Sequence, residues 1–227
     1  MKDKNKKIYY IYKMNGIALN VISLVLFIIM ILLTYFLYPN VYSVFENMNL
    51  ILLFVITFGY LVLHELLHSL AYVIYGGKYN KIIYGIALEL GVFYCLCKQN
   101  ISKNNILHSL LYPFVFIGII TYVIGIIFDI PLLIFLSVIN ITGCSGDIIM
   151  FLFIRKLKDI EFSEMDDPIS FGIYANKDIS KISHFGLDYL GTKEKIDRND
   201  FTKIIVSKPS KYILIILLVL LILAYII

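Results

Sequence analysis

The feature that most limits the fold of this chain is a series of long apolar stretches with almost no charge. The first runs from Gly16 to Tyr38, and as a helix it would be about 34 Å long, enough to cross a hydrocarbon core of about 30 Å. Only 16% of the residues are charged and 60% are hydrophobic, whereas soluble domains carry about 25% charged residues. Lipid is therefore the main solvent, and disordered, collagen-like and disulfide-rich classes are excluded.

Four further stretches pass the same test, at residues 50–75, 106–128, 131–154 and 212–227. The last would form only about 24 Å of helix, which is short for a full crossing. The three residues 129–131 force the helices on either side to be antiparallel neighbours. A cleaved signal peptide is the weaker interpretation of the first stretch, because its apolar run exceeds the usual limit of about 15 residues.

We therefore predict an all-α polytopic membrane protein with about five transmembrane helices. Residues 1–15 would form a cytoplasmic N-terminus and residues 16–154 the membrane core. Residues 155–211 would form a cytoplasmic region, followed by a C-terminal span at 212–227.

The basic residues all fall in three segments. Five precede the first stretch, four lie between residues 76 and 105, and eleven lie between residues 155 and 211, which accounts for all 20. Because basic residues collect on the cytoplasmic side, we expect a multi-pass protein of the cell membrane with its N-terminus in the cytoplasm. Charges dispersed over three loops argue against a face that binds nucleic acid.

Residues 64–68 read HELLH inside the second stretch, where ionisable groups are costly and usually functional. His64 and His68 lie four residues apart, so on a helix both imidazoles project from one face and can bind one metal ion. Glu65 beside them is the candidate general base. Histidines buried only for packing are the simpler alternative, but the pattern favours Zn²⁺ as the cofactor.

Asp147 is the predicted third zinc ligand, since a catalytic site has three protein ligands and an open position. If the second stretch enters the membrane at residue 50 and the fourth at residue 131, HELLH and Asp147 both lie about 24 Å from the outer boundary. The active site would then lie in the cytoplasmic half of the bilayer. Rival ligands fit this depth less well: His108, Glu89 and His184.

Asn140 and Gly143 share a helix face with Asp147, because they precede it by seven and four residues. The amide of Asn140 would point toward the metal. We predict that it binds substrate by hydrogen-bonding a peptide carbonyl or a developing oxyanion. Cys144 is predicted to be a buried free thiol and not a ligand.

HELLH followed on a later span by Asn-x-x-Gly-x-x-Gly-Asp resembles the site-two protease type of intramembrane zinc metalloprotease. It is more closely similar to a family of bacterial membrane proteins called putative zincin peptidases, over about residues 55–175. Site-two proteases usually carry proline where Gly143 stands, and an Asp-Gly pair where this chain has Gly-Asp. The resemblance implies zinc ligation by His64, His68 and Asp147. It also implies Glu65 as the general base and Asn140 as a substrate-binding residue.

These observations predict a zinc-dependent intramembrane metalloprotease that hydrolyses a peptide bond in a transmembrane or membrane-proximal segment, using zinc-activated water and Glu65 as the base. The alternative is a non-proteolytic zinc-binding membrane protein, a transporter or a scaffold. Glu65 favours the enzyme, because zinc binding requires no carboxylate there. The expected partners are a membrane-protein substrate and the lipid bilayer, with no nucleic acid, and a homo-oligomer stays open.

The connection at residues 76–105 begins with two glycines and continues in two extended-looking runs, 79–88 and 90–97. We predict a small membrane-associated β-hairpin after the catalytic helix. Its exposed edge could hold an unwound substrate by strand addition, and a passive connector is the equal alternative. In the cytoplasmic region, residues 169–174 form a predicted short strand that pairs with this hairpin.

Overall fold

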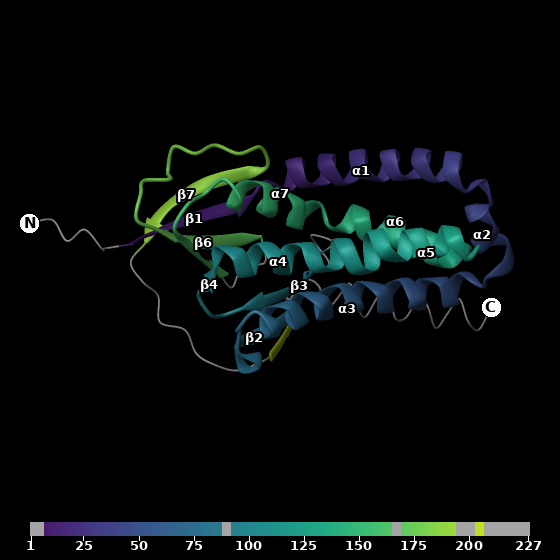
Figure 1. Ribbon diagram of the computed structural model, residues 1–227, viewed down its shortest axis with the longest axis horizontal. Coiled ribbons are helices and arrows are strands. Elements are labelled where there is room, and N and C mark those ends of the chain that lie inside the picture. Colours follow the sequence, from purple (N-terminus) through teal and green to yellow (C-terminus); the bar gives the residue numbers. More distant parts are fainter. Residues whose placement is uncertain (1–6, 88–91, 165–168, 194–202, 207–227) are drawn as a thin grey trace, which may run out of the picture.

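The computed structural model describes residues 7–87, 92–164, 169–193 and 203–206. A bundle of helices extends from a group of strands at one end of the molecule (Figure 1). The helices are α1 (Gly16–Leu37), η1 (Pro39–Tyr42), α2 (Ser43–Asn47), α3 (Leu50–Ile74), η2 (Tyr79–Lys81), α4 (Lys103–Pro113), the π-helix η4 (Phe114–Ile120), α5 (Thr121–Ile127), α6 (Pro131–Gly143) and α7 (Ser145–Ile154). The strands are β1 (Ile8–Met14), β2 (Ile82–Ala87), β3 (Val92–Cys97), β4 (Ile101–Ser102), β5 (Ile160–Glu164), β6 (Ser170–Ala175), β7 (Leu187–Lys193) and β8 (Lys203–Val206).

Three helices in the described part of the chain are long and apolar enough to cross a membrane. They are α1, α3 and the continuous helix Lys103–Ile127, in which α4, η4 and α5 follow one another. A fourth crossing is counted only if α6 and α7, which are bent by 47° relative to each other, form one broken span. These helices indicate membrane association. The fifth predicted span, 212–227, lies outside the described residues.

The prediction of an all-α protein with about five transmembrane helices is wrong. A five-stranded antiparallel sheet lies at one end of the bundle, and the described residues hold three candidate spans, or four if the bent pair counts as one. The strand order of the sheet is β4-β5-β6-β1-β7. Strand β1 comes from residues 1–15, the predicted cytoplasmic N-terminus. It pairs with β6 more than 150 residues later, with Ile8 opposite Ala175. The sequence IYYIYKM is rich in aromatic and β-branched residues, which favour a strand once neighbouring strands cover it. Such distant pairing leaves no local pattern in the sequence.

Strand β6 pairs with β1 and β5. The predicted pairing of residues 169–174 with the hairpin is therefore wrong. The N-terminal segment and the region after α7 instead join in one sheet, although the sequence analysis assigned them to separate parts of the chain.

The largest core lies between this sheet and the helices α4 and α7. Its fully buried side chains include Ile106 of α4, Phe153 of α7 and Phe171 of β6. Tyr12 of β1 contacts the ring of Phe153 and donates a hydrogen bond to the carbonyl of Ile179 at 2.6 Å. Burial raises the pKa of Tyr12 to about 12, so its hydroxyl keeps its proton, and this bond, to higher pH than an exposed tyrosine would.

The predicted β-hairpin is present. Strands β2 and β3 pair antiparallel from Ile82 opposite Cys97 to Ala87 opposite Val92. Strand β8 pairs with the other side of β2 in parallel, so among the described strands β3 forms an edge of this three-stranded sheet. Strand β3 also packs against α3. The hairpin therefore lies beside the helix that carries HELLH.

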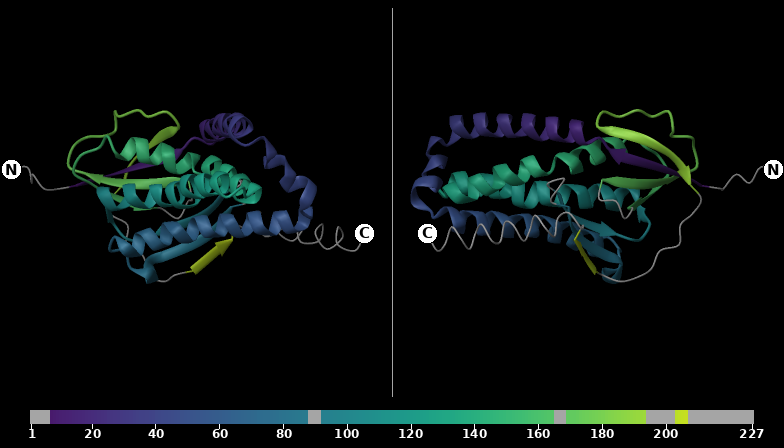
Figure 2. Two further views of the ribbon diagram at one scale, coloured as in Figure 1. Left: turned by 45° about the vertical axis from the view of Figure 1, so that its right-hand side comes forward. Right: turned by 180° about the vertical axis from the view of Figure 1, so that it is seen from behind.

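The helices are arranged so that α1 and α3 lie on opposite sides of the later ones (Figure 2). Helix α1 packs on α6 and α7, whereas α3 packs on α4 and α6. The turn after α5 makes α5 and α6 antiparallel neighbours, as predicted, with Asp129 in the left-handed region at φ 56°. Gly125 permits the close approach, because a Cβ there would lie 2.7 Å from the side chain of Ile134.

Candidate metal centre

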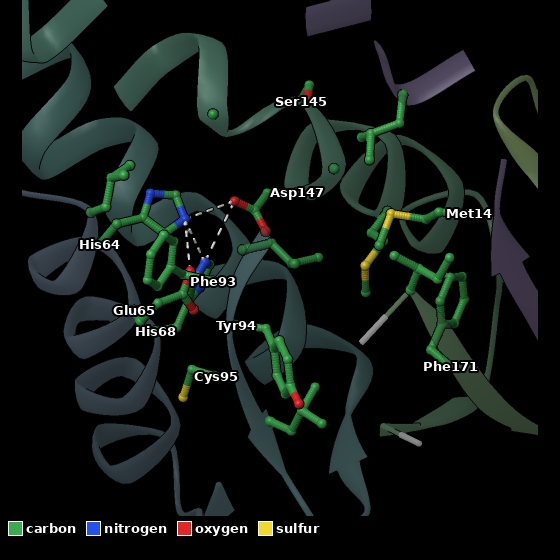
Figure 3. A pocket seen from close by; sticks show the side chains of 18 of the residues that line it. Met14, His64, Glu65, His68, Phe93, Tyr94, Cys95, Ser145, Asp147 and Phe171 are labelled. Carbon is green, nitrogen blue, oxygen red and sulfur yellow. Dashed lines mark hydrogen bonds and ion pairs between the residues drawn. The ribbon is translucent and has the colours of Figure 1, made fainter. Parts of the chain in front are cut away.

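Three predicted zinc ligands meet where the helices join the strands. His64 and His68 come from α3 and Asp147 comes from α7 (Figure 3). The Nε2 atoms of the two histidines lie 3.1 Å apart. The Oδ2 atom of Asp147 lies 3.4 Å from Nε2 of His64 and 3.5 Å from Nε2 of His68. The three side chains that the sequence assigned to one metal site are thus in contact.

The two helices present their ligands in different ways. In α3 the spacing of four residues places both imidazoles on one face, and the helix is continuous for 25 residues. Asp147 lies in the first turn of α7, just after the bend at Cys144. A carboxylate there also faces the positive end of the helix dipole. At the other end of α7, the ammonium of Lys103 donates to the carbonyl oxygens of Arg155 and Leu157.

Hydrogen bonds on the far side of each imidazole define its tautomer. Nδ1 of His64 lies 2.8 Å from Oδ1 of Asn140, and Nδ1 of His68 lies 3.0 Å from the carbonyl oxygen of Ser109. Both partners are acceptors, so each Nδ1 carries the proton. The two Nε2 atoms then present lone pairs toward the carboxylate of Asp147, as metal ligands do.

The donor set fits zinc. Around a tetrahedral Zn²⁺ with bonds of about 2.0–2.1 Å, ligand atoms lie roughly 3.3 Å apart. The three separations here, 3.1, 3.4 and 3.5 Å, agree with that geometry. The two Nε2 lone pairs and the Asp147 carboxylate would repel one another, and a bound cation removes this repulsion. His64 and His68 are both buried, which raises the cost of leaving this charge uncompensated.

Glu65 lies beside the three ligands. One of its carboxylate oxygens is 3.9 Å from Nε2 of His64, and only 13% of its side chain is exposed. The backbone N–H of Cys95, in β3, donates a hydrogen bond to this carboxylate. The candidate base is therefore held between the catalytic helix and the edge strand of the hairpin.

A cavity of about 260 Å³ opens in front of these residues. Its walls come from α1, α3, the edge strand β3, α7 and β6, and they combine polar and apolar side chains. Phe93 and Tyr94 of β3 lie on one side, and Met14 and Phe171 lie on the other (Figure 3). Glu65 lies in the wall of this cavity, which has room for water beside it.

Asn140 is buried and both ends of its amide contact the protein. Its Oδ1 atom accepts from His64, and its Nδ2 atom donates to the carbonyl of Pro113 at 3.0 Å. This geometry favours a role in orienting His64 over the predicted contact with substrate. Cys144 is a buried free thiol, as predicted.

The rival ligands stand apart from this group. His108 stacks on Tyr75, with ring centroids 4.8 Å apart, and His184 lies near Phe153. Glu89 lies outside the described residues.

Three further groups of the site were not predicted from the sequence: the carbonyls of Ser109 and Pro113 and the N–H of Cys95. All three contacts use backbone atoms, which no residue type reveals. The proline within an apolar span was the available signal.

Comparison with known proteins supports a peptidase site in this chain. No curated protein and no solved structure matches the chain. The model of the family described as "Putative zincin peptidase" matches residues 57–160, which hold the HELLH motif, Asn140 and Asp147. Together with the geometry of the ligand group, this match identifies zinc as the cofactor and supports zinc metallopeptidase activity for the chain.

Proposed function

We propose that this protein is an intramembrane metalloprotease, similar to site-two proteases, that hydrolyses a peptide bond in a transmembrane or membrane-proximal protein segment. The observation that carries the proposal is the place of Glu65, a carboxylate outside the three-ligand group that lies beside it at the wall of the cavity. A scaffold or transporter requires the ligands alone. Hydrolysis requires a base at this position.

The residues divide the reaction between them. Zinc, when held by His64, His68 and Asp147, supplies a Lewis acid that acidifies water and polarises a carbonyl. Glu65 accepts the proton of the attacking water and returns it to the nitrogen of the leaving amine. The low exposure of the Glu65 side chain excludes bulk solvent from this proton transfer.

The arrangement of helices supports cleavage within the membrane. Helix α3 is apolar enough to cross a membrane and carries both histidines in its second half. The basic residues of the described chain lie on or next to the strands and at the helix ends that adjoin them. The positive-inside rule therefore favours a multi-pass protein with that end and the N-terminus in the cytoplasm. The metal centre would then lie in the cytoplasmic half of the bilayer.

The edge of β3 is the proposed binding surface for an unwound substrate. Because the N–H of Cys95 points away from β2, the backbone of Phe93 also faces that outer side. A substrate strand added there would place its peptide bonds next to Glu65. Replacing Phe93 with proline removes one outward N–H and spares the ladder to β2, so cleavage should be lost while zinc binding stays normal. Phe93→Ala, which keeps the N–H, is the matched control, and equal cleavage by both variants would overturn strand addition.

Cleavage itself can be tested without knowing the substrate. Membrane fractions from cells carrying the native chain, Glu65→Gln or Asp147→Ala would be compared for new protein N-termini, with zinc measured on each purified protein. We expect fragments cut in or near apolar segments only with the native chain, although Glu65→Gln still binds zinc. If zinc-loaded Glu65→Gln yields the same fragments as the native chain, the proposal fails and the non-proteolytic alternative stands.

A further inference from the structure

Pro113 interrupts the hydrogen-bond ladder of α4 directly beside the metal centre. In an α-helix the carbonyl of Ser109 would accept from the N–H of residue 113, but proline has none. The next N–H, from Phe114, donates to the carbonyl of Leu111. The Ser109 carbonyl is thereby left for Nδ1–H of His68, which it accepts at 3.0 Å.

The carbonyl of Pro113 itself has a similar role one turn later. It lies where the α-helix gives way to the π-helix η4, and it accepts from Nδ2 of Asn140 at 3.0 Å. This bond determines which end of the Asn140 amide points to His64, because Nδ2 must face the carbonyl. Gly118 of η4 leaves the necessary space, since a Cβ there would lie 3.3 Å from Nδ2 of Asn140.

Two backbone carbonyl oxygens, four residues apart on the α4–η4 helix, therefore orient the two histidines of α3. Ser109 acts on His68 directly, and Pro113 acts on His64 through Asn140. Each contact places the proton on Nδ1 and leaves Nε2 free for metal. In a regular α-helix the carbonyl of Ser109 would accept a hydrogen bond from the backbone N–H of residue 113 and would not be free for His68.

We propose that Pro113 and Asn140 are positioning residues of the zinc centre, and that the break in the α4–η4 helix serves to hold His64 and His68 in the Nδ1–H tautomer. The inference rests on the zinc site and not on proteolysis. Outer contacts of this kind typically contribute 10- to 100-fold to metal affinity.

The experiment compares Pro113→Ala with Asn140→Leu and Asn140→Asp. All are made in the full chain carrying Glu65→Gln, so that cleavage has no influence, and zinc affinity is measured by competition with a chelator. The substitution Pro113→Ala restores an N–H that competes with His68 for the Ser109 carbonyl, and zinc affinity should fall roughly 10-fold or more. Asn140→Leu should lower it by a similar factor, whereas Asn140→Asp keeps an acceptor for His64 and should retain most of the affinity.

Imidazole ¹⁵N spectra give a second readout that a general loss of stability does not move. The chain has four histidines, so replacing His108 and His184 with alanine leaves only the two ligands. The native apoprotein should show both in the Nδ1–H form. Pro113→Ala should change His68 and leave His64, whereas Asn140→Leu should do the reverse. Pro39→Ala, in the exposed turn after α1, is the matched control and should change neither.

Several outcomes would overturn the proposal. One is Pro113→Ala with native zinc affinity and an unchanged His68 spectrum. Another is an equal loss of affinity in Asn140→Leu and Asn140→Asp, because a mere packing role would not distinguish them. If Pro113→Ala fails to fold, the two Asn140 variants decide the result alone.

Discussion

Helix α3 and the pair α6–α7 supply the same metal centre by opposite means. Helix α3 is one continuous helix of 25 residues, and its two ligands follow from the regular spacing of i and i+4. The pair α6–α7 is bent by 47° at Cys144, and its single ligand follows from where the second helix begins. Regular helices therefore place ligands by local geometry, whereas a broken helix places them through the contacts that hold the break.

The hydrogen bonds that support α3 and the α6–α7 pair also differ. The histidines of α3 donate their outer hydrogen bonds to Asn140 of α6 and to the backbone of α4. Helix α7 is held at its start by a hydrogen bond between Ser145 and Ser23 of α1 and at its end by Lys103. The outer contacts of α3 thus orient its ligands, whereas those of α7 hold the two ends of the helix that carries its ligand.

The largest effect should come from removing a ligand on either element. His68→Ala and Asp147→Ala should each lower zinc affinity by more than the roughly 100-fold that an outer contact contributes at most. Chelator competition on the purified proteins measures this. If Asp147→Ala retained native affinity while His68→Ala lost it, only the regular helix would carry the site.

The next effect concerns the one residue of HELLH that is polar without being a ligand. Glu65→Gln should bind zinc as the native chain does and lose about 10²- to 10⁴-fold in cleavage rate, because the amide cannot accept the proton of water. The rate is measured on a substrate identified by its fragments, and zinc content is the control. Loss of zinc in this variant would mean that Glu65 acts as a ligand instead.

A smaller effect, on the free energy of unfolding, should distinguish how tightly α6 and α3 are packed. Gly125→Ala places a methyl group 2.7 Å from Ile134 at the start of α6, and such overpacking costs about 1–3 kcal/mol. Gly59→Ala on α3 meets nothing within 4 Å and should stabilise its helix by roughly 0.5–1 kcal/mol. Thermal unfolding in detergent compares them. Equal midpoints would show that the two helices tolerate change alike.

The smallest effect should come from the link between α1 and α7. The hydroxyls of Ser23 and Ser145 lie 2.6 Å apart, and Ser23→Ala should lower stability by about 0.5–1.5 kcal/mol. Leu24→Ala, on the exposed side of the same turn, serves as the control in the same unfolding assay. If the two variants unfold at the same temperature, the hydrogen bond does not hold the bend.

More of the metal site than of the fold could be predicted from the sequence. HELLH carries its own geometry, and Asp147 could be matched to it because helix rise converts sequence position into depth. The predicted hairpin is present for a similar reason, since its strands are neighbours in sequence. The sheet could not be predicted, because β1 and β6 lie on either side of the whole membrane core and a short aromatic run does not identify its partner.

For Asn140, the sequence predicted the helix face but not the hydrogen-bond partners. Its helix face was right, since its amide does point to the zinc centre, but whether it faces substrate or a histidine depends on the carbonyl of Pro113.

By itself, the sequence determined that the chain has apolar helices long enough for a membrane, and that two histidines and a glutamate share one turn of one of them. Both follow from composition and helical period, which are local properties. The tertiary structure alone decided that α6–α7 bends at Cys144, that distant strands form one sheet, and that backbone carbonyls orient the histidines. These depend on contacts between segments far apart in the chain, and a backbone carbonyl has the same chemistry in every residue.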